Sequence, residues 1–331
     1  MRLKNLTNEI IALRDGVLAG RRRALSQAIT LVESTRSDHR DQAAALLAAL
    51  VGHTGQSMRI GLSGTPGVGK STFIESFGMQ LIDKGRKVAV LAVDPSSTIA
   101  GGAILGDKTR MEKLVRQREA FIRPSPSGGE LGGVARRTRE AILLCEAAGF
   151  DTVLVETVGV GQSETTVAQM TDMFLLLLAP AGGDELQGVK RGVMEIADIV
   201  VVNKADGAMK EAAVRTRADY ASALRLFRPR DGEAEGYPMA LTASALEGEG
   251  LEGVWQALRE LDRGRRETGL HSRRRQTQSQ QWFDAALQAQ VMTAFRDRND
   301  LAPLRAAVSE GKLTPDAAAE QGVQAFLKKL V

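Results

Sequence analysis

The fold of this chain is decided by Gly64-Thr65-Pro66-Gly67-Val68-Gly69-Lys70-Ser71. An apolar run, residues 58–62, precedes this stretch, and a helical pattern follows it from Thr72 onward. A strand, a glycine-rich loop and a helix in this order, with this spacing of Lys70 and Ser71, are typical of a Walker A phosphate-binding loop. Its backbone N–H groups converge on phosphate oxygens, its lysine neutralises charge, and its hydroxyl can bind Mg²⁺. We therefore predict nucleotide contacts from Gly64, Gly67, Val68, Gly69, Lys70, Ser71 and Thr72.

Apolar, β-branched runs alternate with helical patterns in the chain from residue 56 onward. Such alternation favours an α/β fold with a doubly wound, mainly parallel sheet and helices on both faces. In that architecture, ligands bind beyond the carboxyl ends of the strands. The expected strands are residues 58–62, 87–93, 120–122, 151–155, 173–178, 198–202 and 238–241.

Three parts are expected along the chain. Residues 1–55 form a helical cap, residues 56–262 the P-loop domain, and residues 263–331 a helical C-terminal extension. In the extension, Trp282 begins an apolar stripe at helical spacing, for which a second subunit is one possible packing partner. Two arginine clusters, at residues 263–266 and 273–275, are interpreted as a solvated helix face. A site for a phosphate or an acidic partner is the alternative for these clusters.

Composition excludes several classes of protein. With 331 residues, 43% of them hydrophobic, the chain can bury a sizeable core. Its single cysteine, Cys145, fits a reducing compartment and is interpreted as a core residue rather than a nucleophile. A signal-peptide core is lacking, and no apolar run approaches the roughly 18 residues of a membrane span, so we expect a soluble cytoplasmic protein. A formal charge of +4 and 4% aromatic residues argue against nucleic acid as the main partner.

The identity of the base is addressed by Asn203-Lys204-Ala205-Asp206, which directly follows an expected strand. A carboxylate here can accept hydrogen bonds from both N1–H and the N2 amino group of guanine, whereas adenine offers neither donor. The alternative is an ordinary polar turn between a strand and a helix. Ser244-Ala245-Leu246 follows the next strand and can complete the pocket through backbone groups. The predicted base-pocket residues are Asn203, Lys204, Asp206, Ser244, Ala245 and Leu246.

Two carboxylates follow expected strands on the phosphate side of the site. Asp94 comes after residues 87–93, and Glu156 after residues 151–155. Parallel strands bring both residues to the edge where Ser71 lies, and Mg²⁺ accepts one or two carboxylates together with hydroxyl oxygens and waters. We therefore predict Ser71, Asp94 and Glu156 as metal ligands. For Asp94, an alternative role is to cap the turn that follows it.

The stretch Glu156-Thr157-Val158-Gly159 is similar to the switch II pattern of GTPases, with Glu in place of the usual Asp. The N–H of Gly159 can meet the γ-phosphate, and a loop held by that contact can collapse when the phosphate leaves. Val160 stands where many GTPases have a water-orienting glutamine, so we expect slow unassisted hydrolysis. A long glycine-rich loop supplies Lys190, which can reach the phosphates. The predicted catalytic residues are Lys70, Gly159 and Lys190.

Beyond the P-loop, six further motifs carry a specific family resemblance. They are residues 93–97 (VDPSS), 105–111 (LGDKTRM), 121–124 (FIRP), 156–164 (ETVGVGQSE), 183–188 (GDELQG) and 202–206 (VNKAD). From about residue 20 to residue 260 the chain resembles the MeaB/ArgK/MMAA family of P-loop G proteins.

This resemblance implies a GTPase chaperone of an adenosylcobalamin-dependent acyl-CoA mutase, typically methylmalonyl-CoA mutase. Such proteins bind GTP, GDP and Mg²⁺, gate cofactor delivery, and protect or reactivate the mutase, which in turn stimulates GTP hydrolysis. The resemblance assigns Mg²⁺ to Ser71, Asp94 and Glu156 and adds Asp107 as a further candidate ligand. It also implies a homodimer built largely through the C-terminal extension, and a third switch loop at residues 182–190.

Two other functions are compatible with the same scaffold. A metallochaperone GTPase for nickel, zinc or cobalt would need a set of His or Cys ligands, and the chain has three scattered histidines and no Cys-x-x-Cys motif. A small-molecule kinase would need an acceptor pocket, and both the guanine motif and the switch-like loop argue against it. Phosphate release measured with and without acceptors separates a kinase from a GTPase.

Overall fold

The computed structural model describes residues 7–93, 111–124, 131–157, 163–180, 191–227, 230–296 and 301–327. Its chain divides into two compact units, Met1–Gln278 and Ser279–Val331, which are described separately below. The three-part division into residues 1–55, 56–262 and 263–331 stays a prediction.

In the described residues, seven strands form one all-parallel sheet with the order β3-β2-β4-β1-β5-β6-β7. Each of the seven expected strands is present within a residue or two of its predicted limits. The predicted doubly wound α/β fold is therefore confirmed. The strands are β1 (Met58–Gly64), β2 (Val88–Val93), β3 (Ala120–Arg123), β4 (Thr152–Thr157), β5 (Met173–Leu178), β6 (Ile199–Val202) and β7 (Met239–Thr242).

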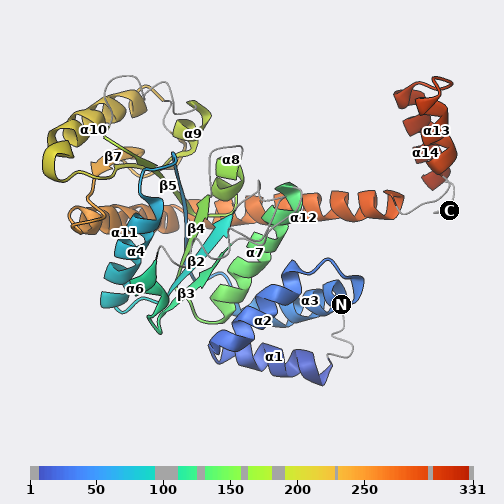
Figure 1. Cartoon of the computed structure of the whole chain (residues 1–331), viewed down its shortest axis with the longest axis horizontal. Helices are drawn as coiled ribbons and strands as arrows, with labels where there is room; N and C mark the ends of the chain where they lie inside the picture. Colours follow the sequence, from blue (N-terminus) through green and yellow to red (C-terminus); the bar gives the residue numbers. More distant parts are fainter. Residues whose placement is uncertain are drawn as a thin grey trace. The chain divides into compact units, whose positions relative to one another are not determined.

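Helices cover both faces of this sheet (Figure 1). On one face, alternate residues of the central strands pack with α4, α6 and α11 in a single apolar cluster that contains Phe73, Phe77 and Trp255. The opposite face contacts α7 and α8, while α10 packs beside β6 and β7. These helices are α4 (Lys70–Asp83), α6 (Glu112–Val115), α7 (Leu131–Ala147), α8 (Ser163–Ala168), α9 (Arg191–Ile196), α10 (Lys210–Leu224) and α11 (Leu251–Glu267).

The N-terminal helices α1 (Asn8–Leu18), α2 (Arg22–Glu33) and α3 (Ser37–Leu50) pack on one another and on α7. Leu25, Ile29 and Val32 lie on one side of α2 and are buried, as their spacing of three to four residues predicts. Helical structure was expected here and is confirmed.

Cys145 lies on α7 and is fully buried. Burial raises the pKa of its thiol, with a smaller contribution from the neighbouring charge of Glu146. A thiol that stays protonated is a poor nucleophile. The interpretation of Cys145 as a core residue is therefore confirmed.

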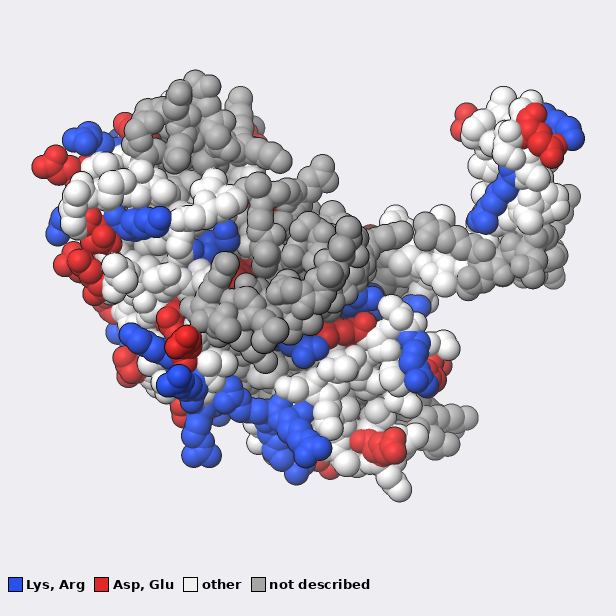
Figure 2. Space-filling view, viewed as in Figure 1, with Lys and Arg blue, Asp and Glu red and all other residues white. Residues whose placement is uncertain are grey.

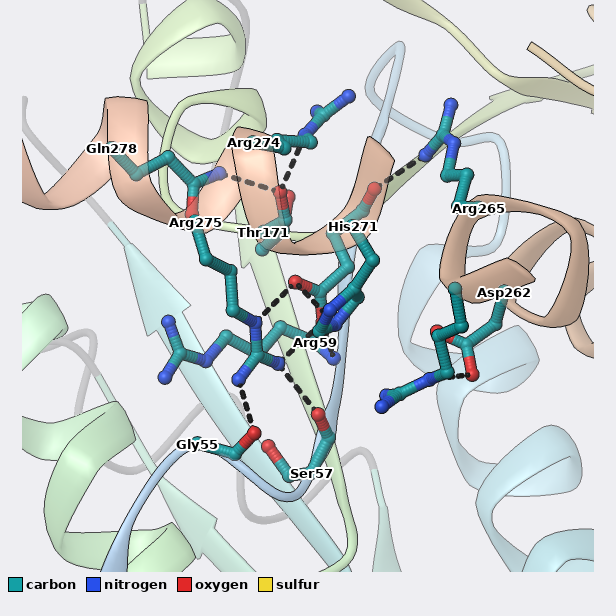
Figure 3. Close-up of polar contacts among 12 residues, drawn as sticks. Gly55, Ser57, Arg59, Thr171, Asp262, Arg265, His271, Arg274, Arg275 and Gln278 are labelled. Carbon is teal, nitrogen blue, oxygen red and sulfur yellow. Dashed lines mark hydrogen bonds and ion pairs between the residues drawn. The ribbon is translucent and has the colours of Figure 1, made fainter. Parts of the chain in front are cut away.

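Three arginines at the junction of α11 and α12 (Leu270–Arg296) correct part of one prediction. Arg265, Arg274 and Arg275 are not a solvated helix face, because their guanidinium groups are largely or fully buried. Figure 3 shows Arg274 and Arg275 projecting from α12 toward the polypeptide at the amino ends of the strands. For these three residues the prediction failed because the anionic partners are far away in the sequence, whereas Arg263, Arg266 and Arg273 are exposed, as predicted.

Two ion-pair clusters hold this junction. Arg275 donates from Nε and Nη2 to the carboxylate of Asp172 at 2.8 and 2.7 Å, and also to the carbonyl oxygens of Gly55 and Ser57. Arg265, whose side chain is 2% exposed, donates from Nη2 to Asp198 Oδ1 at 2.6 Å, and it also pairs with Glu233. Charges buried in such pairs are strongly destabilising when one partner is removed.

The second unit contains the end of α12 together with α13 (Ala302–Ser309) and α14 (Pro315–Leu327). The rings of Phe295 and Phe326 lie 5.5 Å apart between centroids. A mostly apolar groove of about 380 Å³ lies between α13 and α14 and is lined by side chains such as Leu301, Leu304 and Val308. None of the helices that the structure describes is both long and apolar enough to cross a lipid bilayer.

Candidate nucleotide-binding site

The P-loop connects the end of β1 to the start of α4 and depends on glycine at three positions. A Cβ on Gly64 would lie 2.5 Å from the carbonyl oxygen of Leu177, closer than any side chain tolerates. Gly67 and Gly69 have φ angles of 80° and 90°, in the left-handed region that favours glycine. The loop backbone is therefore specified by sequence, and its N–H groups precede a helix N-terminus, where anions bind.

Lys70 begins α4 and folds back over the loop. Its Nζ donates to the carbonyl oxygen of Gly64 at 2.7 Å and to that of Thr65 at 3.4 Å. Burial lowers the pKa of this amine, while the nearby carboxylates of Glu156 and Glu164 act in the opposite direction. The structure thus places the predicted phosphate-binding lysine close to the predicted metal ligand Glu156.

Asn203 joins the P-loop to the predicted base pocket. Its side chain is 1% exposed, and its Nδ2 donates to the carbonyl oxygen of Val68 at 2.9 Å. Its Oδ1 accepts from the backbone N–H of Ala245 at 3.0 Å. One buried amide therefore holds together three segments that are far apart in sequence.

Lys204 and Asp206 complete this loop. Lys204 has a φ of 58°, rare for a residue with a side chain, and its Nζ donates to the carbonyl oxygen of Gly67 at 2.7 Å. Ser244 Oγ hydrogen-bonds to Asp206 Oδ2 and itself accepts from the backbone N–H of Glu247 at 3.1 Å. The carboxylate of Asp206 is thereby oriented, with its other oxygen left to accept hydrogen bonds.

The remaining predicted nucleotide contacts differ in how they can act. Val68 and Ala245 have buried side chains, so they can contribute only backbone groups. The side chain of Leu246 is 79% exposed and therefore accessible from solvent. Ser71 and Thr72 lie in the first turn of α4.

A further residue, Ser76, supports the base pocket and was not identified from the sequence. Its Oγ donates to the carbonyl oxygen of Ala245 at 2.6 Å, across a separation of 169 residues. A serine on an amphipathic helix is unremarkable in sequence, and its partner is a backbone atom. No sequence signal pointed to this contact.

The described part of the metal site consists of Ser71 and Glu156. Glu156 is buried at the carboxyl end of β4, where it pairs in register with Leu62 of β1 and Ala92 of β2. A hydroxyl and a carboxylate at one sheet edge form the hard oxygen set that Mg²⁺ accepts, so these residues fit that ion. Asp94, Asp107, Gly159 and Lys190 lie outside the described residues, so their roles stay predictions.

Comparison with known proteins identifies the family. Residues 25–300 match the family model described as methylmalonyl Co-A mutase-associated GTPase MeaB. The chain belongs to the MeaB family. The resemblance inferred from the sequence motifs is therefore confirmed, and with it a GTPase family whose nucleotides are GTP and GDP.

Relatives of this MeaB-family chain are similar over most of their length. A putative GTPase of Caulobacter vibrioides is 51% identical over 322 residues, which cover 96% of this chain and 98% of the relative. GTPase ArgK of Escherichia coli is 50% identical over 273 residues, 82% of each chain. The mouse protein named methylmalonic aciduria type A homolog, mitochondrial, is 46% identical over 328 residues, 95% of this chain and 79% of the relative.

Among solved structures, the MeaB-family chain is similar to one described as LAO/AO transport system kinase. The TM-score is 0.76 at 39% identity, and the match covers 98% of this chain and 100% of the other. This likeness supports the P-loop α/β fold with helical extensions.

Proposed function

We propose that this MeaB-family GTPase is the chaperone of an adenosylcobalamin-dependent acyl-CoA mutase of the methylmalonyl-CoA mutase type. It gates cofactor loading and protects or reactivates the mutase, and the mutase stimulates its GTP hydrolysis. The observation that carries the nucleotide part is the Asn203 bridge between P-loop and base pocket. The partner is supported by the description of the family, which names that mutase.

Nucleotide binding on this scaffold uses groups that are already oriented. The P-loop N–H groups and Lys70 take the phosphates, and Asp206 takes the guanine edge with Ser244 holding one of its oxygens. Mg²⁺, held by Ser71 and Glu156 with Asp94 and Asp107 as further candidates, would neutralise phosphate charge. Fixed donors aimed at a developing negative charge lower the barrier to phosphoryl transfer.

The switch output is proposed to begin at the end of β4. Thr157 Oγ1 donates to Ser63 Oγ at 2.8 Å, which ties the last residue of β4 to the strand that carries the P-loop. The stretch that contains Gly159 directly follows Thr157 in the sequence. We infer that it starts from a residue held beside the phosphate-binding loop by this hydrogen bond. With Val160 in place of a water-orienting glutamine, slow basal hydrolysis that a partner completes is expected.

A cytoplasmic homodimer is part of the proposal. Phe283, Leu287 and Val291 are exposed and recur every four residues on α12. Exposed apolar stripes of this kind mark protein interfaces. We assign this stripe to contact with a second copy of the chain.

The proposal is tested by measuring phosphate release from GTP with and without the adenosylcobalamin-dependent mutase of the same organism. Hydrolysis should rise manyfold with the mutase, and Lys70→Ala should abolish it in both conditions. An unchanged rate with the mutase would remove the mutase from the proposal. Phosphate transferred to a small acceptor instead of water would indicate a kinase.

A further inference from the structure

The start of α2 carries a cluster of cations that is unusual for the N-terminus of a helix. Arg21, Arg22 and Arg23 open this helix, its first turn contains no acidic residue, and no side chain caps it. The N-terminus of a helix is already positive, so three arginines there are electrostatically unfavourable. Residues that go against the charge preference of a helix terminus are expected mainly at functional sites.

Two more arginines reach the same surface from the segment before β3. Arg22 donates to the carbonyl oxygens of Gln117 and Ala120 at 3.2 and 2.5 Å, which holds α2 against this segment. Arg116 and Arg118 flank Gln117 and are exposed. Figure 2 shows the resulting run of blue side chains beneath the turn between α1 and α2 and the loop that leads into β3.

These cations are not neutralised within the part of the chain that the structure describes. Arg22 is occupied by backbone carbonyls, while Arg21, Arg23, Arg116 and Arg118 form no ion pair with a described carboxylate. Glu119 is the one acidic residue in the segment from Arg116 to Ala120. The surface therefore presents a net positive charge to solvent.

A groove of about 590 Å³ opens beside this surface, between α1 and α2. Apolar side chains form much of its lining, with Ile10 and Leu13 from α1 and Leu31 from α2. The charged lining residues are Arg21, Arg23 and one carboxylate, Glu9, so cations outnumber anions there. An apolar groove bordered by cations is complementary to an amphipathic helix that carries carboxylates beside its apolar face.

We propose that this groove, which Arg21 and Arg23 line, is a docking site for an acidic amphipathic helix of a partner protein, and that the nearby Arg22, Arg116 and Arg118 add to the positive charge beside it. A lipid surface would need no groove, and base stacking would need aromatic side chains, which the described lining of the groove lacks. The chain's own first six residues, MRLKNL, carry two cations and no carboxylate, so they do not complement the arginines.

The probe is a rhodamine-labelled peptide of about 16 residues, long enough to form a helix, with leucines on one face and glutamates beside them. Binding to the full-length protein is followed by fluorescence polarisation at two salt concentrations. We expect binding that weakens with salt, because exposed charges are screened. The same peptide with lysines for glutamates, or with serines for leucines, should not bind.

Two variants locate the site. Arg21→Glu/Arg23→Glu should weaken peptide binding about tenfold, the effect of reversing two exposed charges. Ala12→Tyr places a bulky ring on the exposed groove lining without changing charge, and it should also weaken binding. Arg215→Glu, an exposed arginine on α10, is the matched control and should bind as the wild type does. GTP hydrolysis and thermal unfolding should be unchanged in all three variants.

Three results would overturn the proposal. The first is equal binding of the lysine peptide or the serine peptide. The second is unchanged affinity in both groove variants. The third is binding of phosphatidylserine vesicles or of a single-stranded oligonucleotide that Arg21→Glu/Arg23→Glu abolishes while peptide binding persists. Because GTP hydrolysis is measured separately, failure here is distinguishable from failure of the proposed chaperone function.

Discussion

The side-chain amide of Asn203 and the carbonyl oxygen of Val68 are joined by a hydrogen bond of 2.9 Å that ties the base loop to the P-loop. The same amide accepts from the N–H of Ala245, so the positions of phosphate and base contacts depend on one buried side chain. Such a group is costly to remove because both of its partners lose their hydrogen bonds.

Asn203→Ala should weaken GDP binding by about tenfold or more, since two buried hydrogen bonds are lost. Titration with a fluorescent GDP analogue measures the affinity, and circular dichroism verifies folding. Lys210→Ala, an exposed residue on α10, serves as the control and should bind GDP normally. Wild-type GDP affinity in Asn203→Ala would show that the bridge does not organise the site.

Asp206→Asn should lower the affinity for GTP and raise that for xanthosine triphosphate, because an amide cannot accept from both guanine donors at once. Ser244→Ala is the companion variant, since it removes the contact to Asp206 but keeps the carboxylate. It should weaken GTP binding without favouring xanthosine triphosphate. Competition binding with both nucleotides measures this, and unchanged selectivity in Asp206→Asn would contradict the base-pocket assignment.

Much of the sheet and the site could be predicted from local sequence. Most of the seven strands are short apolar runs that are buried on both faces, and the segments 64–71 and 203–206 lie at the ends of strands that meet at the same edge. Local patterns suffice there because each motif is contiguous and the parallel topology brings its neighbours together.

Contacts between distant residues could not be predicted in this way. Arg275 pairs with Asp172 across 103 residues, and Arg265 pairs with Asp198 across 67, so an arginine-rich stretch looked solvated. Ser76 likewise donates to the carbonyl oxygen of Ala245. Because every residue has such an oxygen, the type of residue at position 245 gives no sign of this contact. A single sequence shows which residues are charged and how apolar residues are spaced. It does not show which distant residue neutralises a given charge.

Arg275→Met should reduce the free energy of unfolding by about 3 kcal/mol, because it leaves the buried carboxylate of Asp172 without its main cation. Arg273→Met on the same helix is the matched control, since Arg273 is exposed, and it should change stability by less than about 0.5 kcal/mol. Urea unfolding followed by circular dichroism measures both. Equal stability of the two variants would mean that the Arg275 pair contributes nothing net.

The same cluster predicts loss of stability in acid. Burial opposes ionisation of Asp172, but the hydrogen bonds and charges of Arg275 and Arg59 outweigh it and hold the pKa of Asp172 below its ordinary value. In the same way, burial opposes ionisation of Asp198, and nearby arginines, Arg265 first, keep its pKa low. A carboxylate with a lowered pKa in the folded state stabilises the fold above its unfolded pKa of about 4, and this contribution is lost as pH falls through the folded pKa.

The contribution of Asp172 and Asp198 to the free energy of unfolding should therefore be constant between pH 7 and pH 5. It should decrease below about pH 4. The deficit of Arg275→Met relative to the wild type should shrink over the same range, because Asp172 is protonated more easily once its cation is gone. Urea titrations at several pH values measure this difference. A deficit that grows as pH falls would contradict the assigned direction of the Asp172 pKa.

The exposed stripe on α12 predicts the assembly state. Phe283 is 66% exposed and Leu287 50%, and both project from the same side of the helix with Val291. Phe283→Glu/Leu287→Glu should convert the protein to a monomer, because charges in an apolar interface are left without partners. Gln281→Glu/Ala285→Glu adds the same charge on the opposite face, where both residues are exposed, and should leave the dimer intact. Light scattering after size-exclusion chromatography gives the mass of each variant, and a dimer that persists in the stripe variant would assign dimerisation to another surface.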